Sequence, residues 1–282
     1  MAIARKPHWL KVKLPAGDNF KELRDIVETH NLHTICSSGR CPNMGECWGE
    51  RTATFMILGN ICTRSCGFCN VLTGKPLAVD WEEPEKVARS IQLMGVKHAV
   101  ITSVDRDDLP DGGVQIWVLT IQKIRAFNPE ITMETLIPDF QGKENLLDEI
   151  ITVSPEVVSH NLETVRRLTR EVRKQAKYDR SLAVLKYLKD KGIRRTKSGI
   201  MLGLGETYDE VIETMHDLRA SGVDVMTIGQ YLQPSSKHLP VVRYPHPDEF
   251  KEYEKIGLEM GFRFVESGPL VRSSYHAHKH IG

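Results

Sequence analysis

Six cysteines are the whole complement of this 282-residue chain, and they fall in two groups of three near its N-terminus. The groups have the spacings C-x4-C-x5-C and C-x3-C-x2-C, over Cys36, Cys41 and Cys47 and over Cys62, Cys66 and Cys69. Each group is one thiolate short of the four that close a tetrahedral zinc site or a four-iron cluster. The spacing therefore predicts two iron–sulfur clusters, each with one position for a ligand other than cysteine.

Overall charge and hydropathy exclude several function classes. The formal net charge is +1 at pH 7, so no broad basic face for nucleic acid is expected. No apolar run approaches the length of a membrane span. The basic segment 1–15 lacks the apolar stretch of a secretory signal, and we therefore expect a cytoplasmic location in which the thiols stay reduced.

The elements that must position these cysteines alternate regularly from about residue 53. Short apolar runs predict strands at 54–59, 98–104, 130–136, 156–161, 197–204 and 223–230. Amphipathic stretches predict helices at 82–95, 113–127, 142–151, 162–170, 178–191, 207–221 and 247–260. Thr207 and Glu210 fit a capping box at the start of one of these helices.

This alternation predicts an α/β fold, a partial (β/α)6 TIM-type barrel. Residues 1–52 are expected to form an N-terminal extension with the first cysteine group, 53–261 the barrel, and 262–282 a tail that folds over the barrel. Active sites of such sheets lie at the C-terminal ends of the strands. The second cysteine group directly follows the first predicted strand, in that position.

Two levels of family resemblance rest on particular motifs. The segment CTRSCGFC (62–69) resembles the C-x3-C-x-aromatic-C signature of the radical S-adenosylmethionine (SAM) superfamily. Longer blocks resemble the lipoyl synthase family: RCPNMGECW (40–48), TSVDRDDLPDGG (102–113), METLIPDF (133–140) and GPLVRSSYHA (268–277). The first cysteine group and the RSSY motif are the specific marks, because other radical SAM enzymes lack them, and the resemblance covers nearly the whole chain.

The resemblance implies which residues bind two [4Fe–4S] clusters and SAM. Cys62, Cys66 and Cys69 would hold the SAM-binding cluster. Cys36, Cys41 and Cys47, with Ser274 of RSSY in preference to Ser273, would hold an auxiliary cluster. The candidates for SAM contacts are Phe68, Ser103, Asp105, Asn161, Glu163 and Arg180. As isolated residues, Ser103 and Asp105 are better explained as a helix cap or part of a solvated loop, and Phe68 is equally well explained as a core aromatic.

The implied activity is the insertion of two sulfur atoms at C6 and C8 of a protein-bound octanoyl-lysyl group, with the auxiliary cluster as sulfur donor. The implied partners are an octanoylated lipoyl-carrier domain or H protein, a reductant protein that donates electrons, and iron–sulfur cluster assembly or carrier proteins. Neither nucleic acid nor a membrane is expected as a partner.

Two other functions stay open at this stage. One is a different radical SAM enzyme with an auxiliary cluster, against which the RSSY motif argues. The other is a zinc or iron–sulfur scaffold in which both cysteine groups are structural. In addition, basic residues at 166, 170, 173, 177 and 180 recur at helical spacing, and a shared basic face would be either solvated or a docking site for an acidic carrier.

Overall fold

Seven parallel strands form the main sheet of the computed structural model, which describes residues 6–11, 18–29, 34, 43–49, 52–153 and 155–281. The strands pair in chain order. They are β1 (Thr52–Ile57), β4 (His98–Ser103), β5 (Thr132–Leu136), β6 (Val157–Ser159), β7 (Arg195–Leu202), β8 (Val225–Gln230) and β9 (Phe264–Gly268). In the described part of the chain no pairing joins β9 to β1. The predicted α/β partial barrel is therefore confirmed.

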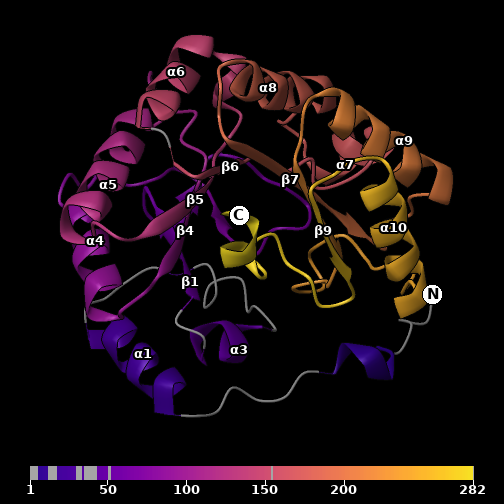
Figure 1. Ribbon diagram of the computed structural model, residues 1–282, viewed down its shortest axis with the longest axis horizontal. Coiled ribbons are helices and arrows are strands. Elements are labelled where there is room, and N and C mark those ends of the chain that lie inside the picture. Colours follow the sequence, from indigo (N-terminus) through magenta and orange to yellow (C-terminus); the bar gives the residue numbers. More distant parts are fainter. Residues whose placement is uncertain are drawn as a thin grey trace.

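The helices that connect the strands lie around the outside of the sheet, as Figure 1 shows. They are α4 (Glu83–Leu93), α5 (Val114–Phe127), α6 (Glu144–Val153), α8 (Tyr178–Asp190), α9 (Tyr208–Ala220) and α10 (Pro247–Glu259). Helix α9 begins at the predicted capping box. The Glu210 N–H donates to Thr207 Oγ1 at 3.3 Å, and the Thr207 N–H donates to the Glu210 carboxylate at 2.8 Å.

The sheet has one strand more than the six that the sequence predicts. Strand β9 comes from the segment assigned to the tail, and it pairs with β8 from Phe264 opposite Val225 to Gly268 opposite Gly229. Its short apolar run is interrupted by Glu266 and Ser267, and this interruption hides the strand in the sequence. The boundary between barrel and tail therefore falls after Gly268 instead of at residue 262.

Shorter elements fill the connections. They are η1 (His8–Leu10), α1 (Asp18–Thr29), α3 (Met44–Gly49), the paired β2 (Ile61–Cys62) and β3 (Leu72–Thr73), η2 (Phe140–Gly142), η3 (Arg166–Leu168), α7 (Thr169–Val172) and η4 (Ala277–Ile281). The predicted helix 162–170 is wrong in its first half, because Glu163 runs beside β7. Its N–H donates to Gly199 O, and its own carbonyl accepts from Met201 N, both at 2.9 Å.

The predicted basic face is also wrong. The five basic residues lie on separate segments, because α7 ends at Val172 and α8 begins at Tyr178. Arg166 pairs with Asp179 and Asp217, and Arg173 is buried. No single helix therefore presents these charges together.

Apolar side chains cover both faces of the sheet. Strands β1 and β8 are buried along their whole length. One cluster of buried side chains joins β1, β4 and β5 to α4, α5 and α6, and a second joins β7 and β8 to α9 and α10. Parallel sheets require this two-sided cover, which explains why the predicted strands appear as continuous apolar runs in the sequence.

The C-terminal segment returns to the middle of the barrel. Figure 1 shows η4 in yellow at the centre of the ring of strands, and η4 contacts β4 and β5. Ala277 and His280 are fully buried there. Between β9 and η4, Arg272 donates to the carbonyl of Gln230 at the end of β8, at 3.1 Å. The tail therefore folds back, as predicted, and its last residues enter the barrel.

Candidate active site

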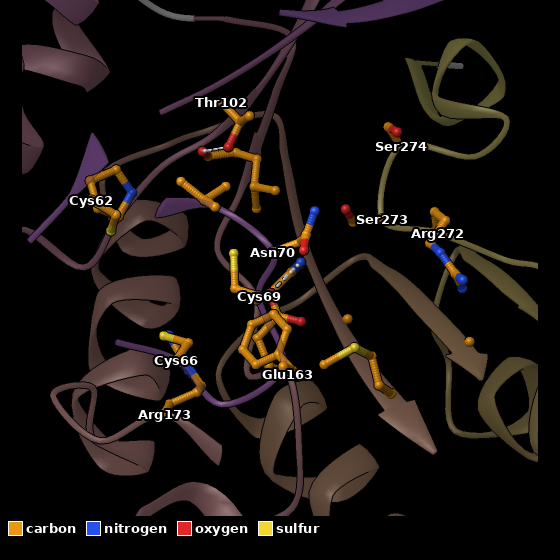
Figure 2. A pocket seen from close by; sticks show the side chains of 18 of the residues that line it. Cys62, Cys66, Cys69, Asn70, Thr102, Glu163, Arg173, Arg272, Ser273 and Ser274 are labelled. Atoms are coloured by element: carbon orange, nitrogen blue, oxygen red, sulfur yellow. Dashed lines mark hydrogen bonds between the residues drawn. The ribbon is translucent and has the colours of Figure 1, made fainter. Parts of the chain in front are cut away.

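A cavity of about 490 Å³ lies within the barrel and reaches the C-terminal ends of the strands. Most of the predicted site residues line it: Cys62, Cys66, Phe68, Cys69, Ser103, Asp105, Asn161, Glu163, Ser273 and Ser274. Figure 2 shows the cysteines and the two serines around this cavity, with the serines on the C-terminal tail. Cys47 and Arg180 are not among the lining residues, and Cys36 and Cys41 lie outside the described residues.

The second cysteine group lies on the loop between β2 and β3. Cys62 ends β2, and Cys66 and Cys69 follow it, joined by a hydrogen bond from Cys69 N to Cys66 O at 3.2 Å. The N–H of Gly67 donates to Val172 O, at the end of α7, at 2.9 Å. The backbone of the loop is thus tied to a neighbouring segment, and this constraint limits how far the three thiols can move apart.

A second loop, near residues 234–240, holds the cysteine loop from another side. Leu239 N donates to Gly67 O at 3.0 Å, and His238 Nε2 lies 3.0 Å from Cys69 O. Ser235 Oγ lies 2.8 Å from the other ring nitrogen of His238. Nothing in the sequence marked His238 as part of the site, because it is far from every cysteine along the chain.

Burial raises the pKa values of the three thiols and so makes them weaker acids. Desolvation raises the pKa of Cys66 to about 12 and that of Cys69 to about 11, and it also raises the pKa of Cys62. The positive charge of Arg173 acts in the opposite direction on Cys66. Iron binds thiolate, so loading of this site must release protons.

Arg64 anchors the cysteine loop from inside. Its side chain is 5% exposed and lies between three carboxylates, at 3.2 Å from Asp105, 2.7 Å from Asp107 and 2.7 Å from Asp139. Asp105 and Asp107 follow β4, and Asp139 follows β5. The guanidinium therefore ties the cysteine loop to the ends of two strands. In the sequence, the position of Arg64 between Cys62 and Cys66 was the only indication that it belongs to the site.

Asn161 and Glu163 lie side by side on the segment after β6, as predicted. Asn161 Nδ2 donates to Glu163 Oε1 at 3.0 Å. Glu163 has a left-handed backbone with φ of 66°, which is strained for a residue other than glycine. Desolvation raises the pKa of Glu163 above its usual value. The backbone strain and the raised pKa of this partly exposed carboxylate are typical of a ligand-binding site.

Of Arg173 and Arg180, it is Arg173 that lines the cavity, and not Arg180 as the sequence suggested. Arg180 reaches the buried carboxylate of Asp139 at 3.1 Å and stays outside the cavity. Arg173 lines the cavity instead, and its Nη1 donates to Leu162 O at 3.1 Å and to Ser181 Oγ at 3.3 Å. From its spacing in the sequence, Arg173 was expected only on a basic helix face.

Ser103 and Asp105 both face the cavity at the end of β4. Ser103 Oγ is buried and has no hydrogen-bond partner among the described residues. Asp105 Oδ2 lies 3.8 Å from Cys62 Sγ, and its backbone N–H donates to the same sulfur at 3.3 Å. Desolvation raises the pKa of Asp105 to about 6, against the opposing effect of Arg64. The location in a cavity favours a ligand-binding role for both residues over a solvated loop.

Helix α3, which carries Cys47, and the residue before it form hydrogen bonds to the tail on both sides of the serine pair. Asn43 Nδ2 donates to Leu270 O at 2.7 Å, and the Tyr275 hydroxyl donates to Glu46 Oε1 at 3.1 Å. Residues more than 220 positions apart in sequence are thus brought together. The structure places the helix of the first cysteine group next to the segment that carries Ser273 and Ser274.

The chemistry of the cavity fits an iron–sulfur cluster with a polar organic ligand. No three His, Cys, Asp or Glu side chains of the described residues converge closely enough to hold a single metal ion. A [4Fe–4S] cluster binds each thiolate to a different iron, so three thiols around a space suit it. Among the described residues, Asn161 Oδ1 and Ser103 Oγ are buried without a hydrogen-bond partner. These unpaired oxygens can form hydrogen bonds to a ligand in the cavity.

Comparisons with known proteins agree with this geometry. Residues 56–218 match the family model of the radical SAM superfamily, and residues 2–41 match the N-terminal domain of lipoyl synthase of that family. The chain is 72% identical to a lipoyl synthase from Christiangramia forsetii, over 98% of this chain and 94% of that one. It is 71% identical to a mitochondrial lipoyl synthase from Nematostella vectensis, over 98% and 95%.

Solved structures show the same fold at low sequence identity. SuiB from Streptococcus suis, bound to S-adenosylmethionine, superposes with a TM-score of 0.60 at 14% identity, over 79% of this chain and 52% of that one. The barrel and its cysteine loop therefore define a radical SAM enzyme, a class whose members carry a [4Fe–4S] cluster and SAM. Within that class, the identities of 71–72% over nearly the full length are decisive. The chain belongs to the lipoyl synthase family, whose enzymes act in the biosynthesis of the lipoyl cofactor.

None of the described helices is both long and apolar enough to cross a membrane.

Proposed function

We propose that this enzyme inserts two sulfur atoms, at C6 and C8, into an octanoyl group attached to a lysine of a carrier protein. The observation that carries the proposal is that the three thiols of the cysteine loop and the serine pair of the tail line one cavity (Figure 2). Sulfur insertion at an unactivated carbon needs a radical generator and a sulfur source that both reach the same carbon. Membership of the lipoyl synthase family supports the same reaction.

In this proposal Cys62, Cys66 and Cys69 are the ligands of the [4Fe–4S] cluster to which SAM binds. When bound there, the cluster and SAM would supply the radical chemistry that removes a hydrogen atom from carbon. The chain's own residues orient SAM. Asn161 and Glu163 offer a donor and acceptors to the ribose hydroxyls, and Phe68 offers an apolar ring surface.

The charged ends of SAM require partners of opposite charge. Arg173 lines the cavity, so we assign it, in place of Arg180, to the SAM carboxylate. Ser103 and Asp105 are the acceptors at the end of β4 that suit the amino group. Arg180 supports the site indirectly, because it neutralises the buried Asp139 that also holds Arg64.

A second [4Fe–4S] cluster, held by Cys36, Cys41, Cys47 and Ser274, is proposed as the sulfur donor. The two hydrogen bonds between α3 and the tail support this assignment, because they keep Cys47 near the serine turn. A serine oxygen is a less suitable ligand for cluster iron than a thiolate. Ser274 would therefore be the weakest of the four protein ligands of this cluster.

The cavity walls supply the environment that a carbon-centred radical needs. Apolar side chains make up much of the lining, among them Val71, Val100, Val104, Leu136, Ile137 and Ile200. They can pack along an acyl chain and keep water away from the reacting carbons. No general base is required, because an alkyl C–H bond has no acidic proton.

Anaerobic turnover tests the proposed reaction. The reconstituted enzyme is incubated with SAM, a strong reductant and an octanoyl-lysyl peptide, and the peptide is weighed by mass spectrometry. The expected product has gained two sulfur atoms and lost two hydrogen atoms, with formation of 5′-deoxyadenosine. Deoxyadenosine without sulfur transfer would assign the chain to a different radical SAM reaction. Neither product from fully loaded protein would favour a structural role for the clusters.

The neighbouring serines provide a matched pair of variants. We expect Ser274→Ala to keep most of the bound iron, because three thiolates still hold the auxiliary cluster, as three thiolates hold the other one. Deoxyadenosine formation should persist, and sulfur insertion should fall at least about 100-fold. Ser273→Ala is the control, with iron content and insertion close to wild type. The reverse result would transfer the ligand role to Ser273.

The partners and the location are proposed in the same way. A carrier domain or H protein presents the octanoyl group, a reductant protein delivers electrons, and cluster assembly or carrier proteins restore the auxiliary cluster after each turnover. The cytoplasmic location stays a prediction, because one relative at 71% identity has a mitochondrial name.

A further inference from the structure

A buried ion pair lies inside the barrel among residues that the proposed chemistry does not use. Lys197 Nζ of β7 is 2.8 Å from Glu134 Oε2 of β5, and both side chains are fully buried. Glu134 Oε1 accepts a hydrogen bond from Ser159 Oγ of β6 at 2.7 Å. None of the three residues lines the large cavity. A buried ion pair is usually no more stabilising than apolar side chains of similar volume. This pair is therefore expected to have another structural role.

The C-terminal tail supplies the fourth member of this group. His280 of η4 is fully buried, and its Nδ1 lies 3.3 Å from Lys197 Nζ. Its ring packs on Phe264 of β9, with the ring centres 5.7 Å apart. The ion pair therefore serves as a socket, defined here as Glu134 with Lys197, into which the side chain of His280 fits.

The contacts define the protonation state of His280. A lysine ammonium group can only donate, so Nδ1 must accept and carry no proton. The proton then resides on Nε2, which faces Glu266 Oε1 at 3.8 Å. Desolvation, together with the charge of Lys197, lowers the pKa of His280. The neutral ring can therefore accept from Lys197 without adding a second buried positive charge.

The socket and β9 hold the tail at both ends of the serine turn. On one side Gly268 is paired with Gly229 of β8. On the other side His280 is held in the barrel, and Ser273 and Ser274 lie between these two points. The position of the serines in the cavity therefore depends on whether η4 stays in the barrel.

We propose that His280 is a positioning residue that anchors the tail in the Glu134–Lys197 socket and thereby sets the position of Ser273 and Ser274 in the active-site cavity. The consequence for sulfur insertion rests on the proposed function of Ser274 as a cluster ligand, whereas the anchoring itself does not. His280 touches neither the cysteines nor the serines in the described contacts, so it acts only through the tail.

Hydrogen exchange of the cluster-free chain tests the anchoring directly. In His280→Ala, exchange in residues 269–276 should accelerate at least about tenfold, because the tail loses its buried hydrogen bond and packing. Exchange in β5 and β7 should change far less. The control is His278→Ala, which removes an exposed histidine from the same short helix and should leave the exchange of 269–276 unchanged. His280→Gln, which retains an acceptor for Lys197, should restore most of the protection.

Iron content of the reconstituted variants separates positioning from a general loss of structure. His280→Ala should keep most of its iron and still form deoxyadenosine from SAM, whereas sulfur insertion should fall as it does in Ser274→Ala. If His280→Ala fails to fold, the double variant Glu134→Leu with Lys197→Met replaces the socket with apolar side chains, which proteins often tolerate. It should free the tail in the same way.

The outcomes distinguish the two proposals. Unchanged exchange of 269–276 in the His280 and socket variants would overturn the anchoring. So would equal acceleration in His280→Ala and His278→Ala. Faster tail exchange in His280→Ala, combined with unimpaired sulfur insertion in Ser274→Ala, would support the anchoring and refute the ligand role of Ser274.

Discussion

Replacing Cys66 with alanine is expected to abolish the formation of 5′-deoxyadenosine, with a decrease of at least about 1,000-fold. The thiol lines the cavity together with those of Cys62 and Cys69, and no other cysteine of the described residues lines it. A cluster with only two protein ligands is not retained, so the electron that cleaves SAM has no path. Deoxyadenosine is measured by chromatography after anaerobic incubation with SAM and a reductant, together with iron content.

Cys47→Ala is the matched control, since it removes one thiol from the other group. It should keep deoxyadenosine formation and lose sulfur insertion, because Cys47 lies on α3, outside the cavity. Equal loss of deoxyadenosine in both variants would mean that the two cysteine groups do not have separate roles. Retained deoxyadenosine formation in Cys66→Ala would refute the assignment of the radical-generating cluster.

Asp139→Ala is expected to cause the largest loss of stability, about 3 kcal/mol in the free energy of unfolding. The carboxylate is fully buried and holds two cations, Arg64 at 2.7 Å and Arg180 at 3.1 Å. Burial alone would raise the pKa of Asp139, but the hydrogen bonds from Arg64 keep it well below the usual range. Removal of the carboxylate leaves Arg64 with fewer partners in a site that is only 5% exposed.

Denaturant unfolding of the cluster-free chain measures this effect, and iron retention measures its consequence for the cysteine loop. Glu85→Gln is the control, because Glu85 also pairs with two cations, Arg89 and Lys123, but its side chain is 39% exposed to solvent and theirs are more so. Exposed ion pairs contribute little, so no measurable change is expected there. Equal stability of Asp139→Ala and wild type would show that Asp105 and Asp107 are sufficient to hold Arg64.

The local patterns of the sequence were informative wherever neighbours along the chain decide the structure. The spacing C-x3-C-x2-C put three thiols on one loop, and the continuous apolar runs of β1 and β8 marked strands buried on both faces. The capping box at Thr207 located the start of α9. In each case the relevant contacts are made within a few residues, so a short stretch of sequence contains the whole cause.

The errors have a common physical origin in contacts between distant segments. Strand β9 is short and interrupted by polar residues, and it exists because β8 offers its free edge. Glu163 lies alongside β7 instead of entering a helix, because its backbone is hydrogen-bonded to Gly199 and Met201 of that strand. Arg173 and Arg180 have the same chemistry, but Arg180 pairs with Asp139 outside the cavity, whereas Arg173 lines the cavity and donates to Leu162 O and Ser181 Oγ.

The sequence by itself therefore determined the family, the barrel and the cysteines that can hold clusters, because these depend on residue type and spacing. Only the tertiary structure decided that the tail enters the barrel, that His280 meets Lys197, and that Ser273 and Ser274 line the same cavity as the cysteines. The reason is that hydrogen bonds and ion pairs between residues far apart in sequence leave no periodic pattern along the chain.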